Sequence, residues 1–197
     1  RAAFRAISAE APGVLFVFGS ISEDDRNRLT AWHAGTEAAR YDKVHLFRPN
    51  GEHLLWQPGD RYVALRWRGL TLGLINCNDV RFPEQARALR LQARCGLLLA
   101  PAWWPWRRDH VWRTLLRARA LENGAFVAGC CVSASVHEAE EFAGAGNHVF
   151  DPLGRPVETQ DDRGYLLELE SPPALVVDPL QQAVEIERVE VCEVAAS

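Results

Sequence analysis

GLTLGLINCNDVRFPE, residues 69–84, is the stretch that decides the fold. Its first part, Leu70 to Ile75, is apolar at nearly every position, which is typical of a strand that is buried on both faces. The chain then becomes polar around one thiol, Cys77, and reaches Pro83 and Glu84, a pair that suits the first turn of a helix. We therefore expect Cys77 at the C-terminal tip of a strand, on a sharp turn that faces a helix N-terminus.

A cysteine in that position has the surroundings of a nucleophile. Backbone N–H groups at the start of a helix can stabilise an oxyanion, and they lower the pKa of a thiol. The alternative is a small cysteine in the core, because free cysteines are among the most buried residues. The polar neighbours Asn76, Asn78 and Asp79 favour the functional interpretation, since a core cysteine does not need them.

Length and composition are typical of one globular domain. The 197 residues suffice for a sizeable core, with 48% hydrophobic and 24% charged residues. A net charge of −4 gives no reason to expect nucleic acid or an anionic membrane as a partner. We find no apolar run long enough to span a bilayer and no signal peptide, and we expect a cytoplasmic protein.

The five cysteines form an odd set without metal-ligand spacing, so we expect reduced thiols, no metal site and no cofactor. Cys130 and Cys131 are neighbours in a predicted strand, where successive side chains face opposite ways, so we expect no disulfide between them. The chain contains no Met, and we expect that it does not begin at a natural start.

Lys43 is the one lysine among 22 basic residues. A general bias toward arginine explains the other positions. The surviving lysine is then of interest, because a primary amine is a compact point charge that the planar guanidinium of arginine cannot replace.

The rest of the chain reads as strands that alternate with helices, which favours an α/β fold. Pro49 to Asp60 is a long loop, of the kind that is often functional in a compact domain. The expected helices cover residues 1–11, 84–94 and 107–123. The expected strands cover residues 14–18, 29–33, 37–41, 61–68, 70–75, 97–100 and 125–132, with a polar turn at 22–28.

Several motifs resemble one family. CNDVRFPE resembles the nucleophile motif of the nitrilase superfamily of carbon–nitrogen hydrolases, usually Cys-Tyr-Asp-x-Arg-Phe-Pro-Glu. YDKVHLF and GEHLLWQPGD resemble the segments of its catalytic lysine and second glutamate, and HVWRTLLRARALEN and NHVFDPLGRPV resemble later elements. The resemblance covers residues 13–157. HLFRxxGEH, AWWP and WRTLLxARAxEN are most similar to the omega-amidase branch, which hydrolyses dicarboxylic acid monoamides such as 2-oxoglutaramate.

The resemblance implies an αββα sandwich of two mixed sheets flanked by helices, in one domain over residues 1–197 that is incomplete at its N-terminus. It also implies a homodimer or a higher homo-oligomer. Residues 166–197 depart from the family. They alternate Val and Ile with Glu, which predicts an extra strand or an edge extension.

The implied reaction is hydrolysis of a small carboxamide through a cysteine thioester, with release of ammonia. Cys77 would be the nucleophile, Lys43 would stabilise the tetrahedral intermediate, and Glu52 would orient Lys43 and the substrate. The backbone N–H of Asn78 is a candidate oxyanion donor, although Asn replaces the usual Tyr there. Trp104, in the aromatic loop, is a candidate substrate contact; a dimer contact and plain packing are the alternatives.

The largest departure concerns the general-base glutamate, which the family carries on an early strand. No residue before Lys43 fits it, and Glu138, Glu140 and Glu141 are the other carboxylates that could approach the site. Either the segment with the base is missing from this sequence, or the chain is a non-catalytic homologue that acts as a binding or partner subunit.

A third hypothesis is an unrelated cysteine hydrolase, in which His45 or His110 would activate Cys77. Buried histidines normally find structural partners, and in the family the position of His45 is structural, so we favour a supporting role for it.

Overall fold

Two β-sheets form the centre of the computed structural model, which describes residues 1–132, 136–137, 140–142, 146–157 and 189–194. The smaller sheet is antiparallel, in the order β1-β2-β3. Its strands are β1 (Leu15–Glu23), β2 (Arg26–His33) and β3 (Thr36–Asp42). The larger sheet is mixed, in the order β10-β7-β6-β5-β4-β11. Its strands are β4 (Tyr62–Trp67), β5 (Leu70–Leu74), β6 (Leu97–Ala102), β7 (Phe126–Cys131), β10 (His148–Phe150) and β11 (Val189–Glu193).

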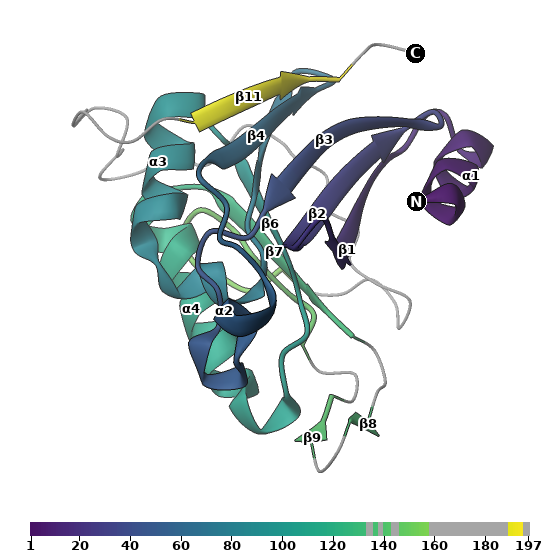
Figure 1. Ribbon diagram of the computed structural model, residues 1–197. Coiled ribbons are helices and arrows are strands. Elements are labelled where there is room, and N and C mark those ends of the chain that lie inside the picture. The colour runs from purple at the N-terminus through teal and green to yellow at the C-terminus, as the bar shows by residue number, and fades with distance from the viewer. Residues whose placement is uncertain (133–135, 138–139, 143–145, 158–188, 195–197) are drawn as a thin grey trace.

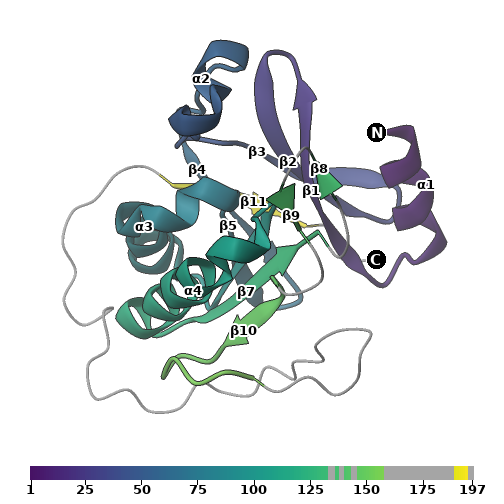
Figure 2. The same cartoon turned by 90° about the horizontal axis from the view of Figure 1, so that it is seen from below.

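Helices cover the outer faces of both sheets (Figure 1). α3 (Pro83–Ala93) and α4 (Asp109–Asn123) lie side by side on the larger sheet, and Figure 2 shows α1 (Ala2–Glu10) on the far side of the smaller one. The ring of Phe4 stacks on Phe18 of β1 at 4.2 Å between centroids, which attaches α1 to its sheet. The layers therefore follow the order α, β, β, α, as expected for the αββα sandwich.

The core consists of two layers of apolar side chains on either face of the larger sheet. Leu29 and Tyr41 of the smaller sheet meet Leu65 and Leu74 of the larger one between the sheets. A second cluster, which includes Leu98, fills the space under α3 and α4. Because strand side chains alternate, β5 and β6 must be apolar on both faces, which explains their continuous apolar sequence.

Tight turns join the strands of the smaller sheet. Ala34 and Gly35, both at positive φ, close the hairpin between β2 and β3. Asp24 and Asp25, at φ 50° and 56°, close another one where the sequence predicted a longer polar turn. Aspartate tolerates the left-handed conformation, so this turn needs only two residues and both strands extend further than predicted.

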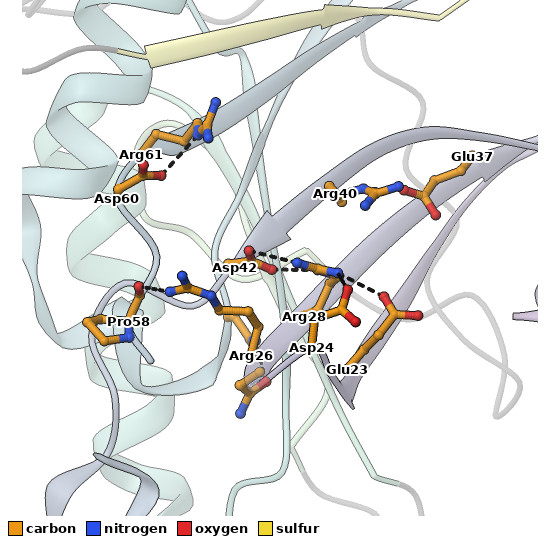
Figure 3. Close-up of polar contacts among 12 residues, drawn as sticks. Glu23, Asp24, Arg26, Arg28, Glu37, Arg40, Asp42, Pro58, Asp60 and Arg61 are labelled. Atoms are coloured by element: carbon orange, nitrogen blue, oxygen red, sulfur yellow. Dashed lines mark hydrogen bonds and ion pairs between the residues drawn. The ribbon is translucent and has the colours of Figure 1, made fainter. Parts of the chain in front are cut away.

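Arg28 neutralises the acidic residues around that turn (Figure 3). Its guanidinium donates to Asp42 at 2.6 and 3.0 Å and to Glu23 and Asp24 at 2.9 Å each. The Arg28 side chain is only 8% exposed, and its charge-assisted bonds to Glu23 and Asp42 are better shielded from water than the bond to the exposed Asp24. They fix the end of β3, directly before Lys43.

The predicted loop of residues 49–60 contains two short helical turns, η1 (Arg48–Asn50) and α2 (Glu52–Leu55). Its far end returns to β3, where the N–H of Gly59 donates to the carbonyl of Lys43 at 2.9 Å. A Cβ at Gly59 would lie 2.1 Å from the carbonyl oxygen of Asp42, so only glycine permits this approach. The loop is thereby fastened at both ends, with Glu52 between them.

Part of the divergent C-terminal stretch is a strand, as predicted. β11 lies parallel to β4 at the edge of the larger sheet, with Val191 opposite Ala64. The rest of residues 166–197, except Val194, lies outside the described residues. β8 (Val136–His137) and β9 (Glu140–Glu141) form a small separate hairpin. Among the described helices, none has the length and apolar character needed to cross a bilayer.

Candidate active site

The nucleophile turn follows β5 directly, as predicted. Cys77 begins a short 3₁₀ turn, η2 (Cys77–Arg81), and adopts φ 51°, a conformation that side chains rarely take. This turn separates the strand from α3, which starts at Pro83. Cys77 is thus at the start of a 3₁₀ turn that lies between the strand and the helix N-terminus that the sequence predicted it to face.

Asp79 holds this turn in place. Its carboxylate is fully buried and accepts four hydrogen bonds. One oxygen takes the backbone N–H and Nδ1 of His45, both at 2.9 Å, and the other takes the hydroxyl of Tyr41 at 2.8 Å and the N–H of Asn76 at 3.1 Å. The side-chain amide of Asn78 donates to the carbonyl of His45 at 3.0 Å. Together these bonds lock the turn to the segment after β3.

Lys43 and Glu52, which the sequence separates by a loop, form a buried ion pair. Lys43 Nζ lies 2.8 Å from both carboxylate oxygens of Glu52, and its side chain is 1% exposed. The N–H of Phe47 also donates to Glu52, at 2.6 Å. A buried ammonium requires such a partner, so the pair fixes the position of the single lysine.

The Cys77 thiol shares its environment with this ion pair. Burial raises the pKa of the thiol, the positive charge of Lys43 acts against that rise, and the negative charges of Glu52 and Asp79 add to it. The expectation that the turn lowers the pKa of Cys77 is therefore wrong. Loss of water around the sulfur outweighs the favourable charge of Lys43.

The aromatic loop after β6 borders the thiol. The Sγ of Cys77 lies 3.9 Å from the carbonyl oxygen of Trp103. Trp104 is buried; its indole N–H donates to the carbonyl of Arg108 at 2.9 Å, and its ring lies 4.7 Å from the guanidinium of Arg81. Trp104 thus supports Arg81, and its direct contact with substrate stays a prediction, as does the oxyanion role of the Asn78 backbone.

Two arginines near the site were not singled out by the sequence: Arg81, which interacts electrostatically with Cys77, and Arg108, which neighbours Arg81. Burial and the neighbouring Arg108 lower the pKa of Arg81, while the charge of Cys77 opposes this. Arg108 lies over the ring of Phe47 at 5.6 Å. Within the described part of the chain, neither guanidinium forms an ion pair with a carboxylate, and the Nε of each is buried without a hydrogen-bond partner. The chain has 21 arginines besides its one lysine, so composition could not distinguish these two.

The histidines have structural surroundings. Nδ1 of His45 is held by Asp79, and its ring stacks on Phe82 at 3.8 Å, in agreement with a supporting role. His110 is exposed on α4. His148 bonds to Asp109 at 2.8 Å, so Asp109, the first residue of α4, joins this helix to β10. Among the described residues, no group of three or more His, Cys, Asp or Glu side chains could hold a metal ion.

The early carboxylates Glu23 and Asp24, which precede Lys43 in the chain, have other partners. Glu23 and Asp24 are engaged with Arg28, and bonds to Arg1 and Arg28 lower the pKa of Glu23 to about 2. Glu138 lies outside the described residues, and for Glu140 and Glu141 only the strand is described. Whether one of these three glutamates supplies the general base therefore stays a prediction.

Comparisons with known proteins agree with this site. Residues 8–164 match the profile of the carbon–nitrogen hydrolase family. The chain is 38% identical to omega-amidase YafV of Escherichia coli K12 over 135 residues, which cover 68% of this chain and 51% of that protein. It is 35% identical to the 2-oxoglutaramate amidase of Bacillus subtilis over 153 residues, 75% of this chain and 58% of that protein. The chain thus spans about half the length of the curated relatives it matches.

Solved structures show the same fold. A CN-hydrolase superfamily protein from Xanthomonas campestris, with an arsenic adduct in its active site, is 31% identical with a TM-score of 0.68, covering 78% of this chain and 60% of that one. A variant of the amidase from Nesterenkonia sp. AN1, with acrylamide added to its active-site cysteine, is 30% identical with a TM-score of 0.69, covering 78% and 61%. By its sequence profile and its fold, this chain belongs to the carbon–nitrogen hydrolase family, the nitrilase superfamily that its motifs indicated.

Proposed function

We propose that this chain hydrolyses the terminal amide of a dicarboxylic acid monoamide, a compound like 2-oxoglutaramate, and releases ammonia through a thioester on Cys77. The observation that carries the proposal is that the Cys77 thiol interacts with the buried Lys43–Glu52 pair and with Arg81, which has Arg108 as its neighbour. The Lys43–Glu52 pair can stabilise the oxyanion that forms at the amide, and the two arginines can bind the carboxylate at the other end of the substrate.

The amide end is attacked by the sulfur of Cys77. As the C–S bond forms, the carbonyl oxygen becomes an oxyanion, which the Lys43 ammonium and the N–H of Asn78 stabilise. The C–N bond then breaks, the nitrogen leaves as ammonia, and a thioester remains. Water hydrolyses the thioester to the free acid and restores the thiol. Because burial raises the pKa of Cys77, the attack requires a base that takes the thiol proton as the bond forms.

Glu52 contributes by position. Both of its oxygens accept hydrogen bonds from the Lys43 ammonium and so fix its position. The N–H of Phe47 donates to the same carboxylate and fixes Glu52 in turn. A donor held in advance needs no reorganisation when charge develops on the substrate, which is the usual origin of large electrostatic effects in catalysis.

The acid end of the substrate would be bound by Arg81 and Arg108. A guanidinium binds a carboxylate through two parallel N–H bonds, and the buried Nε atoms of both side chains lack partners in the described structure. A carboxylate between them would relieve the repulsion that lowers the pKa of Arg81. The names of the relatives, omega-amidase and 2-oxoglutaramate amidase, agree with such a substrate.

The experiment is ammonia release from succinamate and 2-oxoglutaramate, with butyramide as the substrate that lacks the second carboxylate. It uses the 197-residue chain and any longer product of the same reading frame, with Cys77→Ala as the inactive control. We expect Arg81→Gln to raise KM for succinamate at least tenfold, as for a lost charged hydrogen bond, with little change for butyramide. The matched control is Arg117→Gln, on an exposed part of α4.

Three results would count against the proposal. Ammonia release that survives Cys77→Ala would refute the thioester. Equal loss on succinamate and butyramide in Arg81→Gln would refute the assignment of the acid end. Alkylation of Cys77 without ammonia release in every form would favour the binding or partner-subunit alternative. The expected homo-oligomer is likewise a proposal, which light scattering of the purified chain would test.

A further inference from the structure

A second cysteine, Cys131, lies close to the nucleophile turn and has no part in the proposed reaction. Cys131 ends β7, where it is paired in parallel register with Ala102 of β6. The next residue after Ala102 is Trp103, whose carbonyl oxygen lies 3.9 Å from the Sγ of Cys77. The backbone of Trp104 in turn hydrogen-bonds the thiol of Cys131. Both sulfurs thus contact the same short stretch of the aromatic loop.

The side chain of Cys131 also faces the same way as the thiol of Cys77. Cys131, Ala102 and Cys77 all pack against the cluster under α3 and α4. Cys130, one residue earlier in the strand, is exposed and by alternation faces the other side of the sheet. Only the second of the two neighbouring cysteines is therefore directed toward the site.

Gly146 and Asn147 pack against Cys131. Gly146 covers it so closely that a Cβ there would lie 2.4 Å from Sγ, and the side-chain oxygen of Asn147 accepts from the N–H of Cys131 at 2.9 Å. Cys77, at φ 51°, sits on a turn whose conformation is held by surrounding bonds. Both cysteines are half-buried and free.

We propose that Cys131 is a resolving thiol, which protects an oxidised Cys77 by forming a reversible Cys77–Cys131 disulfide. The oxidant is a hydroperoxide, with hydrogen peroxide as the simplest case. The inference rests on the proposed function only in that Cys77 must be reactive. It adds a redox-controlled state in which the nucleophile is blocked and can be restored.

The chemistry has two steps. The sulfur of Cys77 attacks one peroxide oxygen, the O–O bond breaks, and a sulfenic acid and one water form. The sulfur of Cys131 then attacks the sulfur of Cys77, the S–O bond breaks, and the hydroxyl leaves as water with the proton of the Cys131 thiol. Peroxide is reduced and the two thiols are oxidised to one disulfide. Dithiothreitol then reduces the disulfide by thiol–disulfide exchange: Cys77 and Cys131 return to thiols, and dithiothreitol is oxidised to its cyclic disulfide.

The experiment treats the chain with hydrogen peroxide, maps disulfides by mass spectrometry of unreduced peptides, and then adds dithiothreitol. Wild-type protein is expected to show a Cys77–Cys131 peptide pair, to lose its iodoacetamide-reactive Cys77, and to recover it on reduction. In Cys131→Ser the pair cannot form, so Cys77 proceeds to the sulfinic acid and is not recovered. Cys130→Ser is the matched control and is expected to behave like the wild type.

Two outcomes would overturn the proposal. One is wild-type protein in which peroxide yields no Cys77–Cys131 pair, or links Cys77 to another cysteine. The other is recovery of Cys77 in Cys131→Ser to the wild-type extent. The peptide map of the wild type decides the question even if that variant does not fold. Since the readout is the sulfur itself, a chain that lacks amidase activity but forms the pair would contradict the proposed function and leave this inference standing.

Discussion

Replacing Asp79 by Asn should lower the stability of the protein, because it removes hydrogen bonds that hold the nucleophile turn. The fully buried carboxylate accepts four hydrogen bonds, two on each oxygen. In Asp79→Asn, one oxygen becomes an NH₂ group, which faces donors and cannot accept. If the remaining oxygen serves His45, the N–H of Asn76 loses its acceptor. The hydroxyl of Tyr41 also loses its acceptor, and it already accepts from Val44 and Gln85.

The cost can be worked from these contacts. A hydrogen bond to a charged group contributes roughly 1.5–3 kcal/mol, so two lost bonds amount to roughly 3–6 kcal/mol. Relief from burying a charge offsets part of this, and we expect the free energy of unfolding to fall by about 3 kcal/mol. That is a large part of the 5–15 kcal/mol that is usual for a domain.

Urea unfolding followed by tryptophan fluorescence at pH 7 measures the loss. The matched control is Asp60→Asn, because Asp60 is 82% exposed and its ion pair within the described structure is with its neighbour Arg61 at the surface; such pairs contribute roughly 0–1 kcal/mol. A urea midpoint for Asp79→Asn equal to that of Asp60→Asn would refute the view that Asp79 holds the nucleophile turn.

Three further predictions concern charge and packing. Lys43→Met removes the positive charge that lowers the pKa of Cys77, so the pH profile of iodoacetamide alkylation should move to higher pH. An unchanged profile would mean that the charge of Lys43 does not influence the Cys77 thiol. Glu23 has its pKa lowered from 4.5 to about 2, so its stabilising effect is present above pH 4.5 and is lost as the pH falls toward 2. The difference in urea midpoint between wild type and Glu23→Gln should shrink over that range, and a constant difference would contradict it. Gly129→Ala puts a methyl group 2.4 Å from Cδ1 of Leu116 and should lower the free energy of unfolding, measured in urea, by about 1–3 kcal/mol. An unchanged free energy of unfolding would mean that Leu116 and α4 can shift to make room for the methyl group.

The parts of the fold that were predictable are those encoded by local pattern. The apolar run before Cys77, Pro83 after it, and the hairpin at Ala34 and Gly35 each determine their structure within a few residues. The pairing of Lys43 with Glu52 came only from the motifs of the family, because nothing local shows that a loop will bring a carboxylate onto a buried amine.

The errors have a common physical cause. The pKa of Cys77 depends on how much water the folded chain excludes, which no short window of sequence reveals. Arg81 and Arg108 matter because the described structure gives them no carboxylate partner, and pairing is a tertiary property. The turn at Asp24 was assigned too long because Arg28, several residues on, compensates the acidic side chains that favoured a loop.

The parallel pairing of β11 with β4 has a consequence for the order of folding. Arg66 and Glu193, bonded across these strands at 2.6 Å, are 127 positions apart in the chain. Closing so long a loop costs conformational entropy before the contacts between the strands form and offset it. This pairing therefore belongs to the late events of folding. On the ribosome, β4 must wait with one backbone edge open until residues 189–193 emerge. During that interval the open edge can pair with other extended chains, and a chaperone that shields extended segments would act at this point.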